Sequence, residues 1–396
     1  MTQAAAQSSA SATADVIVVG AGPAGSSAAY HMATLGLDVI LLEKQELGRD
    51  KVCGDGLTPS AVRELVSMGV DTSGWQRNRG LRVIGGGHLL HFPWPEQASF
   101  PSYGMARPRA LLDRDLAEHA AAAGARLLTG VTVTGPVTSP TGRVTGVEAR
   151  PTNRVAYPGI ETPTTFTAPL VIDAGGVSAR LATAVGRTKN ERRPMGVALR
   201  AYFRSPRAKD AWMESRLELW DGKPGKSDLL PGYGWIWSVG EGLVNVGLGS
   251  VSSRASATAI DYRAVFNRWM DNVPASWGFT KENQVGGLVS AALPMAFNRK
   301  PHYADGLMLL GDAGGMVSPF NGEGIAQALL SGRLAAQAAA QAAARSTTSG
   351  REQVLAQYPK ALSAEMGGYY TLGRVFVALI EHPEVMRLCT RYGLPR

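Results

Sequence analysis

The sequence predicts an α/β fold in which a parallel sheet carries an inserted antiparallel β-sheet and is followed by a helical segment. Three observations lead to this prediction. Residues 15–44 have the pattern of a strand, a glycine turn, a helix and a second strand. Residues 194–301 are rich in strand-like segments and hold six of the eight tryptophans. Residues 364–396 intersperse apolar residues with arginines, which indicates a segment that docks on the body or lies on an anionic membrane.

Length and composition limit the class of protein. The chain has 396 residues, of which 45% are hydrophobic and 18% are charged, as is usual for a soluble globular protein with two or more domains. Its 40 basic and 32 acidic residues give a formal net charge of +8. This positive net charge is compatible with binding to an anionic membrane surface, or it has no specific role. The sequence has no dense Lys/Arg block, so nucleic-acid binding is the least favoured interpretation.

Three features predict where the protein is found. The chain has two cysteines, Cys53 and Cys389, which are too few for a disulfide framework or a metal site and indicate a reducing compartment. Residues 1–14 are rich in Ala, Ser, Thr and Gln and lack the basic start and apolar centre of a signal peptide, so we expect a disordered tail. No window approaches the roughly 18 apolar residues of a membrane span. We therefore expect a cytoplasmic protein that at most lies on a membrane.

The first element is a strand over Val16–Val19, whose uninterrupted apolar run is typical of a parallel strand buried on both faces. It ends in G-x-G-x-x-G, formed by Gly20, Gly22 and Gly25 at the start of a helix. These glycines permit a tight turn, close approach of a pyrophosphate and close helix packing, while the helix N-terminus attracts phosphates. Glu43 ends the second strand, where it is placed to accept hydrogen bonds from a ribose, which favours FAD or NAD over NADP. The alternative is a glycine-rich turn in an ordinary βαβ unit, but strand, helix and acid supply the context that the motif requires.

The stretch after the second strand is rich in glycine and is expected to form a loop, after which Pro59 takes the first position of a short helix. Cys53 in this loop is either a small thiol beside a ring or a buried structural cysteine. Arg49 and Lys51 are either solvated charges or contacts to a phosphate or a flavin.

The middle of the chain alternates between β-rich and helical patterns. Short strand-like segments rich in glycine, aromatic residues and proline over residues 81–95 indicate a second, β-rich unit. Residues 105–123 have helical spacing, and Arg109 and Asp113 within them suggest a surface i,i+4 ion pair. The next predicted strands cover residues 126–128, 131–149, 164–168 and 170–173, with a Pro/Thr-rich loop before residue 164.

The tryptophan-rich block over residues 194–301 has two interpretations. Its aromatic side chains either form a wall for a large apolar substrate or are simply a well-packed face of a β-sheet. The residue pattern leaves both interpretations open.

A further strand–loop–helix unit follows this block. Residues 306–312 are expected to form an apolar strand that ends in Asp312, followed by a Pro/Asn/Gly loop and a long Ala-rich helix. The carboxyl end of a strand facing a helix N-terminus is where α/β sheets bind ligands. We expect Asp312 to accept a hydrogen bond from a ribityl or ribose hydroxyl, with a helix N-cap as the alternative. The amides of Gly324 and Ile325 are expected to donate to an anion.

Three elements in a fixed order, GAGPAG with its acid, IDAGG and GDAGGMVSPFNGEGI, resemble the FAD-binding signature of the para-hydroxybenzoate hydroxylase superfamily. KVCGDGL and GYGWIWSVGEGLVNVGLG resemble the geranylgeranyl reductase family, whose Tyr-x-Trp-x-Phe-Pro motif and following Gly-x-Gly line a prenyl site. GDGLTP, FPSYG, LPGYGWI, WGF and ALPM are similar to actinobacterial menaquinone reductases. The chain departs from the family pattern at Trp237 and Ser238, which replace Phe and Pro, and at Asp173, which lies one residue early.

The resemblance implies a domain arrangement. A discontinuous, Rossmann-like FAD-binding domain of the glutathione-reductase type would comprise residues 15–80, 104–188 and 301–345. An inserted antiparallel β-sheet substrate domain would comprise residues 81–103 and 189–300, and a C-terminal helical segment residues 346–396.

The resemblance also implies a reaction, in which reduced FAD delivers hydride from N5 to an isoprenoid C=C bond in the polyprenyl tail of menaquinone or in a geranylgeranyl group. The implied partner is therefore a lipophilic prenyl or quinone substrate, with possible contact to an anionic membrane and NAD(P)H or a ferredoxin-like protein as reductant. Cys53, Tyr233 and Trp235 would be catalytic, with Cys53 and Tyr233 as candidate proton donors, and Trp237, Gly247 and Gly249 would bind substrate. The implied FAD-binding residues are Gly20, Gly22, Ala24, Gly25, Glu43, Lys44, Arg49, Cys53, Gly54, Arg109, Val131, Gly175, Gly311, Asp312, Pro319, Gly322, Gly324 and Ile325.

Three other functions are compatible with the same sequence motifs. An FAD-dependent monooxygenase of an aromatic, polyketide-like substrate would share the fold and would predict rapid flavin reduction by NAD(P)H. A flavin halogenase is less favoured because its Trp-x-Trp-x-Ile-Pro motif is not matched by residues 233–238. A non-catalytic prenyl-lipid or quinone carrier with a structural flavin is the weakest alternative, since every flavin-contacting element is retained.

Overall fold

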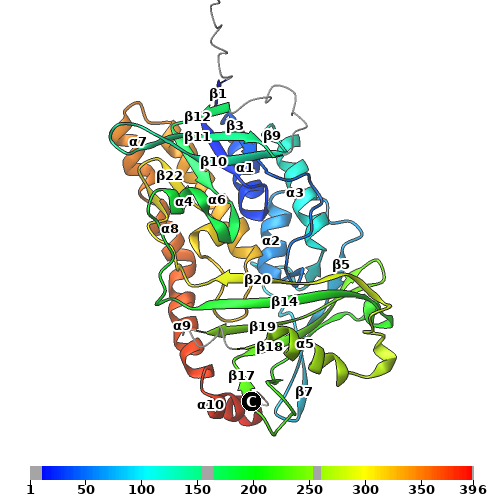
Figure 1. The fold of residues 1–396 in the computed structure, drawn as a ribbon. Coiled ribbons are helices and arrows are strands. Elements are labelled where there is room, and N and C mark those ends of the chain that lie inside the picture. Colours follow the sequence, from blue (N-terminus) through cyan, green and yellow to red (C-terminus); the bar gives the residue numbers. More distant parts are fainter. Residues whose placement is uncertain (1–10, 153–163, 253–259, 395–396) are drawn as a thin grey trace, which may run out of the picture.

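The computed structural model describes residues 11–152, 164–252 and 260–394, and it confirms the predicted α/β fold class (Figure 1). Its centre is a six-stranded sheet that is parallel except at one edge strand. The order of its strands is β21 (Tyr303–Ala304), β22 (Leu307–Leu309), β13 (Leu170–Asp173), β2 (Val16–Val19), β3 (Val39–Leu42) and β9 (Arg126–Leu128).

Both faces of this parallel sheet are covered, which explains its continuous apolar strands. Because side chains alternate along a strand, Val16 and Val18 pack with helices while Ile17 packs with a second sheet. The helices are α1 (Pro23–Thr34), α3 (Arg109–Ala122) and α6 (Ile325–Ala343), with the short α4 (Arg180–Ala184) after β13.

The second sheet has four strands, in the order β1 (Ser11–Thr13), β12 (Thr164–Thr167), β11 (Val144–Pro151) and β10 (Val131–Thr138). The expectation of a disordered tail over residues 1–14 is wrong for residues 11–13, because Ser11–Thr13 form strand β1 and pair in parallel with β12. Residues 1–10 and the Pro/Thr-rich loop over residues 153–163 lie outside the described residues.

A seven-stranded, mainly antiparallel sheet lies beside the parallel-sheet unit (Figure 1). Its strands come from two separate stretches of chain, and α5 (Tyr262–Asp271) covers its outer face. Their order is β20 (Gln284–Pro294), β14 (Met195–Arg204), β19 (Leu243–Ser252), β18 (Gly232–Gly240), β15 (Trp212–Arg216), β6 (Gly80–Gly85) and β7 (His88–Pro93).

Smaller elements join the two large sheets. Helix α2 (Pro59–Ser67) starts at Pro59 as predicted. The predicted helix over residues 105–123 begins only at Arg109, because Met105 and Ala106 pair with neighbouring strands instead. The small sheets are β4 (Gly56–Leu57), β8 (Gly104–Ala106) and β5 (Gln76–Asn78), and β16 (Leu219–Trp220) with β17 (Leu229–Leu230).

The C-terminal helices run down one side of the molecule, from the parallel-sheet unit to the seven-stranded sheet (Figure 1). None of the helices in the described residues has the length and apolar character needed to cross a bilayer. These C-terminal helices are α7 (Thr348–Leu355), α8 (Tyr358–Leu362), α9 (Gly368–Ile380) and α10 (Pro383–Leu388), with π-helical turns at Ser363–Gly367 and Cys389–Gly393.

Candidate active site

The glycine turn between β2 and α1 has the geometry that its motif predicts. Gly20 adopts a φ of +103°, which favours glycine, and its amide donates to the Leu42 carbonyl over 2.7 Å. A Cβ atom on Gly25 would overlap the Gly20 carbonyl oxygen, so this position must stay small. At Gly22, by contrast, a Cβ would meet no protein atom within 4 Å, so the turn is open on that side.

The Glu43 carboxylate holds this turn from the end of β3. It is buried, and it accepts hydrogen bonds from the amides of Ala21 (3.0 Å) and Gln45 (3.1 Å). The Arg49 Nε atom lies 3.6 Å from the same carboxylate, so these two predicted cofactor residues form an ion pair. The Glu43 carbonyl also accepts from the Val131 amide over 2.9 Å. The neighbouring Lys44 is exposed. Direct contacts of Glu43, Lys44, Arg49 and Val131 to a nucleotide stay predictions.

Asp173 organises the second glycine element, at the end of β13. Its carboxylate accepts from the amides of Gly175 and Ala182, each over 3.0 Å, and burial raises its pKa. A Cβ on Gly20 would lie 2.5 Å from the Ala174 carbonyl oxygen, so the first and second glycine elements lie in direct contact.

The third element brings Asp312 to the same edge of the sheet. The strand ends at Leu309 rather than at Asp312, which lies in a 3-10 turn over Gly311–Gly314. The Lys51 Nζ atom lies 3.8 Å from the Asp312 carboxylate, and burial together with the charge of Arg109 lowers the Lys51 pKa. Lys51 is thus paired with Asp312 although its side chain is still 30% exposed, and its contact with a phosphate or a flavin stays a prediction.

Helix α6 presents its N-terminus to this region. Gly324 is the N-cap and no side chain caps the helix, so the alternative role of Asp312 as its cap is wrong. Gly322 precedes it with a φ of +71°. Gly311 adopts a φ of +54°, and a Cβ there would lie 3.0 Å from that of Ala24.

These features fit a dinucleotide cofactor. Helices α1 and α6 both begin without a side-chain cap, which leaves amide donors for anionic groups. The open side at Gly22 and the Lys51 ammonium add space and positive charge at the same sheet edge. The described residues contain no cluster of three or more His, Cys, Asp or Glu side chains able to hold a metal ion.

The Cys53 loop contains a buried acid that the sequence analysis missed. Asp55 is fully buried with a φ of +64°, and its carboxylate accepts from the Tyr202 hydroxyl (2.5 Å), the Asn245 amide (2.8 Å) and the Arg109 backbone amide (3.2 Å). Burial raises the pKa of Asp55 to about 6, against the opposing effect of these hydrogen bonds. A signal was available, because this acid stands between two glycines in the cysteine motif.

Asn245, which is also fully buried, joins this loop to the seven-stranded sheet. Its side-chain amide donates to the Cys53 carbonyl and to Asp55, each over 2.8 Å. Its side-chain oxygen accepts from the Trp235 indole over 2.8 Å. One asparagine therefore fixes Trp235 and Cys53, two predicted catalytic residues, relative to each other.

Arg109 and Asp113 form the expected i,i+4 ion pair, but the expectation of a surface pair is wrong. Both residues are buried, and the Arg109 Nε atom lies 2.8 Å from the Asp113 carboxylate. The Arg109 guanidinium also interacts with the Cys53 side chain. Burial raises the pKa of the Cys53 thiol even though Arg109 opposes this effect, so the thiol stays protonated near neutral pH.

Three aromatic residues of β18 face the Cys53 loop because alternate residues of a strand share one face. The Tyr233 hydroxyl donates to the Asn321 carbonyl over 2.6 Å, which links the strand to the loop before α6. The Trp237 indole lies directly against Gly54 and Gly56, where any Cβ would overlap it.

The predicted substrate-binding glycines face these aromatic rings. Gly247 stands opposite Trp235 in the ladder, and Gly249 opposite Tyr233. A Cβ on Gly247 would overlap the Trp235 indole, so this glycine makes room for the ring. Trp235 is only 4% exposed, so the aromatic block is a packed sheet face at this position. Contact of these residues with a substrate stays a prediction.

Comparison with known proteins places this site in a family. Residues 13–361 match the family described as FAD binding domain. The menaquinone reductase of Mycolicibacterium smegmatis is 35% identical over 379 residues, which cover 95% of this chain and 86% of the relative. The chain belongs to the geranylgeranyl reductase family of FAD-dependent oxidoreductases.

As a member of the geranylgeranyl reductase family, the chain uses FAD as its cofactor. A digeranylgeranylglycerophospholipid reductase of Methanothermobacter thermautotrophicus is 29% identical over 89% of this chain and 83% of the relative. The crystal structure of a geranylgeranyl bacteriochlorophyll reductase-like protein from Thermoplasma acidophilum superimposes with a TM-score of 0.76. It is 23% identical, and the match covers 97% of this chain and 98% of that one, which shows a shared fold.

Proposed function

We propose that this protein hydrogenates an isoprenoid C=C bond, in the polyprenyl tail of menaquinone or in a geranylgeranyl group. The observation that carries the proposal is the meeting of three elements: the Cys53 loop, the aromatic strand β18 and the cofactor loop before α6. The relatives named menaquinone reductase and digeranylgeranylglycerophospholipid reductase support the same substrate class.

Bound reduced FAD supplies a hydride to one alkene carbon, and a proton must reach the other carbon. We assign Cys53 as the donor of this proton. Tyr233 is the other candidate, but its hydroxyl hydrogen is already donated to the Asn321 carbonyl, and burial near Glu323 raises its pKa. The Cys53 sulfur accepts a hydrogen bond from the Asp55 amide over 3.3 Å, so its own proton is not used in that contact.

The remaining chemistry of the site is positioning. An isolated alkene is not activated, so orientation and exclusion of water contribute most to the rate. Trp237 supplies rigid apolar surface, the buried Trp235 supports the Cys53 loop through Asn245, and the glycines beside the two rings let them approach the backbone. The uncapped N-terminus of α6 and Lys51 place positive charge near Asp312, where negative charge on a reduced cofactor would be stabilised.

We further propose that the protein is cytoplasmic and contacts the membrane from the side, because a polyprenyl substrate resides in the bilayer. The reductant is proposed to be NAD(P)H or a ferredoxin-like protein. Bleaching of the oxidised flavin absorbance by NAD(P)H under anaerobic conditions would select the first, and bleaching only by a reduced ferredoxin would select the second.

The proposed reaction is tested by reducing the purified flavoprotein with dithionite without oxygen and adding menaquinone in detergent. We expect a mass gain of two hydrogens that is retained after the quinone ring is reoxidised, which places the saturation in the tail. The variant Cys53→Ala should lower the rate at least tenfold, as is usual for loss of a positioned acid. Cys389→Ala, which removes an exposed cysteine, is the matched control and should leave the rate unchanged. No mass gain, with an oxygen-dependent product from an aromatic compound, would instead identify a monooxygenase.

A further inference from the structure

Glu323, in the loop before α6, is an acid whose partners in the described part of the chain are all neutral. It is half-buried, and no Lys, Arg or His of the described residues forms an ion pair with it. Its carboxylate is hydrogen-bonded to the side chains of Thr58, Asn321 and Gln327. Burial raises the pKa of Glu323, and these hydrogen bonds oppose the effect only in part. On helix α2, by contrast, the burial of Glu64 is outweighed by hydrogen bonds and ion pairs to two arginines, which lower its pKa.

The Thr58 hydroxyl serves Glu323 rather than the helix that Thr58 begins. Thr58 is the N-cap of α2, where a threonine side chain commonly accepts a hydrogen bond from a helix amide, but no such bond forms here. The hydroxyl donates instead to the Glu323 carboxylate, 265 residues along the chain. It also lies 2.7 Å from the Ser60 hydroxyl. Because a hydroxyl has one hydrogen to donate, Ser60 donates to Thr58 while Thr58 donates to Glu323. The three side chains thus form a continuous row of hydrogen bonds.

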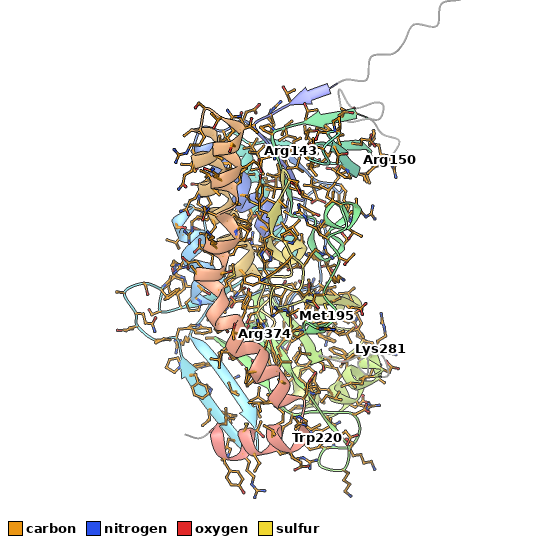
Figure 2. All side chains as sticks on the ribbon, turned by 90° about the vertical axis from the view of Figure 1, so that its left-hand side faces the viewer. Arg143, Arg150, Met195, Trp220, Lys281 and Arg374 are labelled. Carbon is orange, nitrogen blue, oxygen red and sulfur yellow. The ribbon has the colours of Figure 1, made fainter. Side chains whose placement is uncertain are left out.

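Ser60 is the outer end of this row, because it lines a pocket of about 130 Å³. The pocket lies between α2, α6 and the start of α9, the helix on which Figure 2 labels Arg374, and its lining includes the exposed Glu365. Its volume holds several water molecules, each of which occupies about 30 Å³ in the liquid. Gln327 also lines the pocket, and its buried side-chain oxygen has no hydrogen-bond partner among the described residues. We expect a pocket water to donate to this oxygen.

Glu323 is the inner end of the row, and Asn321 joins it to the candidate active site. The Asn321 side-chain oxygen accepts from the Glu323 amide over 3.1 Å, and the Asn321 carbonyl accepts from the Tyr233 hydroxyl over 2.6 Å. Cys53 packs against the apolar cluster that contains Ile325, two residues after Glu323. The row of hydrogen bonds therefore leads from the pocket to the surroundings of Cys53.

We propose that Glu323, Thr58 and Ser60, which we call the proton path, carry solvent protons to the candidate active site. The need for them rests on the proposed function, in which each turnover transfers the Cys53 proton to an alkene carbon. The resulting thiolate must regain a proton, and a polyprenyl tail in the site keeps bulk water out.

The transfers along the proton path balance. Glu323 gives its proton through a water molecule to the Cys53 sulfur, where an S–H bond forms. Thr58 gives its hydroxyl hydrogen to the Glu323 carboxylate and takes that of Ser60, which in turn takes a proton from pocket water. Each of these transfers breaks one O–H bond and forms the next. The net change is one proton moved from solvent to sulfur, without oxidation or reduction.

The test is a single turnover of the FAD-loaded protein, reduced with stoichiometric dithionite without oxygen and mixed with menaquinol in detergent. Menaquinol is used because its ring is already reduced and takes up no protons of its own. Product mass at quenched times gives the rate of hydrogenation, and a pH-indicator dye in weak buffer gives the rate of proton uptake. In the wild type the two rates should agree. In Glu323→Gln and in Thr58→Val, proton uptake should slow about tenfold or more relative to product formation, because Cys53 already carries its proton when the turnover begins.

The conservative variant Thr58→Ser keeps the hydroxyl and should recover the proton uptake that Thr58→Val loses. Ser67→Ala, which removes an exposed hydroxyl at the other end of α2, is the matched control and should behave like the wild type. FAD affinity is measured for every variant. A merely structural tie between Thr58 and Glu323 would weaken FAD binding in Thr58→Val but leave proton uptake in step with product formation, which would overturn the proposal. If Glu323→Gln fails to load FAD, the two Thr58 variants decide.

The outcomes also separate the proton path from the proposed function. Hydrogenation with unchanged proton uptake in every variant would refute the proton path and leave the proposed function standing. Hydrogenation slowed as much as proton uptake in Glu323→Gln would make Glu323 the direct donor to the alkene, which would likewise overturn a path that ends at Cys53. No mass gain in the wild type would refute the proposed function and, with it, the role of the proton path.

Discussion

Replacement of Asp55 by Asn isolates the effect of the buried carboxylate. Asn tolerates the positive φ of this position, and its side-chain oxygen can still accept from Tyr202 and Asn245. Its NH2 group would face the Arg109 amide in place of the second carboxylate oxygen, so the variant removes the charge and one hydrogen bond, and the cost of that hydrogen bond does not depend on pH. In the wild type, burial raises the pKa from an ordinary 3.8 to about 6. That difference corresponds to about 3 kcal/mol.

The sign follows from proton linkage. Between about pH 4 and pH 6 the folded protein keeps the Asp55 proton while the unfolded chain loses it, so the free energy of unfolding falls as the pH rises. Asp55→Asn lacks this titration. The difference in unfolding free energy between variant and wild type should therefore shift by about 3 kcal/mol in favour of the variant between pH 4 and pH 7.

The assay is urea unfolding followed by tryptophan fluorescence at a series of pH values, with the same excess of FAD for both proteins. Using the difference between the two proteins cancels the titration of all other groups. Tyr202→Phe provides a second check, because its hydroxyl lowers the Asp55 pKa and its loss should move the transition above pH 6. A difference between variant and wild type that is the same at pH 4 and pH 7 would refute the reasoning.

Three other changes have expected outcomes of their own. Gly25→Ala should weaken FAD binding at least tenfold, measured by quenching of flavin fluorescence, because its Cβ overlaps the turn; Gly135→Ala, where a Cβ meets nothing within 4 Å, is the control. Asn245→Leu should lower the unfolding free energy by about 3 kcal/mol, since the Trp235 indole and the Cys53 carbonyl each lose this partner and Asp55 loses one of its three donors; a loss below about 1 kcal/mol would contradict this account. Burial lowers the pKa of His302 to about 4, so between pH 6.5 and pH 4 the unfolded chain binds a proton at this side chain that the folded protein does not. The free energy of unfolding of the wild type should therefore fall by about 3 kcal/mol over this range, and His302→Gln should lack this decrease in the same urea assay.

The parts of the fold that the sequence predicts are those with local signals. The strand, glycine turn and helix around Gly20 follow from neighbouring residues, and the acid at Glu43 lies only one helix away. Strand β1 was missed because its Ala/Ser/Thr composition is typical of a disordered tail, while its partner β12 lies more than 150 residues along the chain. The pairing is therefore absent from any local pattern.

In the candidate active site, too, contacts between residues far apart in the sequence could not be predicted. Asp55 between two glycines has the appearance of a turn residue, because its partners Tyr202 and Asn245 lie 147 and 190 residues away. Arg109 and Asp113 have the spacing of a surface ion pair, and only the packing of the cysteine loop over α3 buries them. Spacing reports which side chains are neighbours on a helix, but it does not report what covers them.

The order of strands in the parallel sheet has a consequence for synthesis on the ribosome. Strand β2 forms near the start of the chain, yet the central strand β13 and its neighbour β22 are made much later, and α6 follows β22. Domains fold as units during translation, and long-range pairing must wait for the later partner. The nascent protein therefore carries an incomplete FAD cradle until residues beyond 325 have left the exit tunnel. Flavin loading should be a late step, and chains released before α6 should emerge as apoprotein.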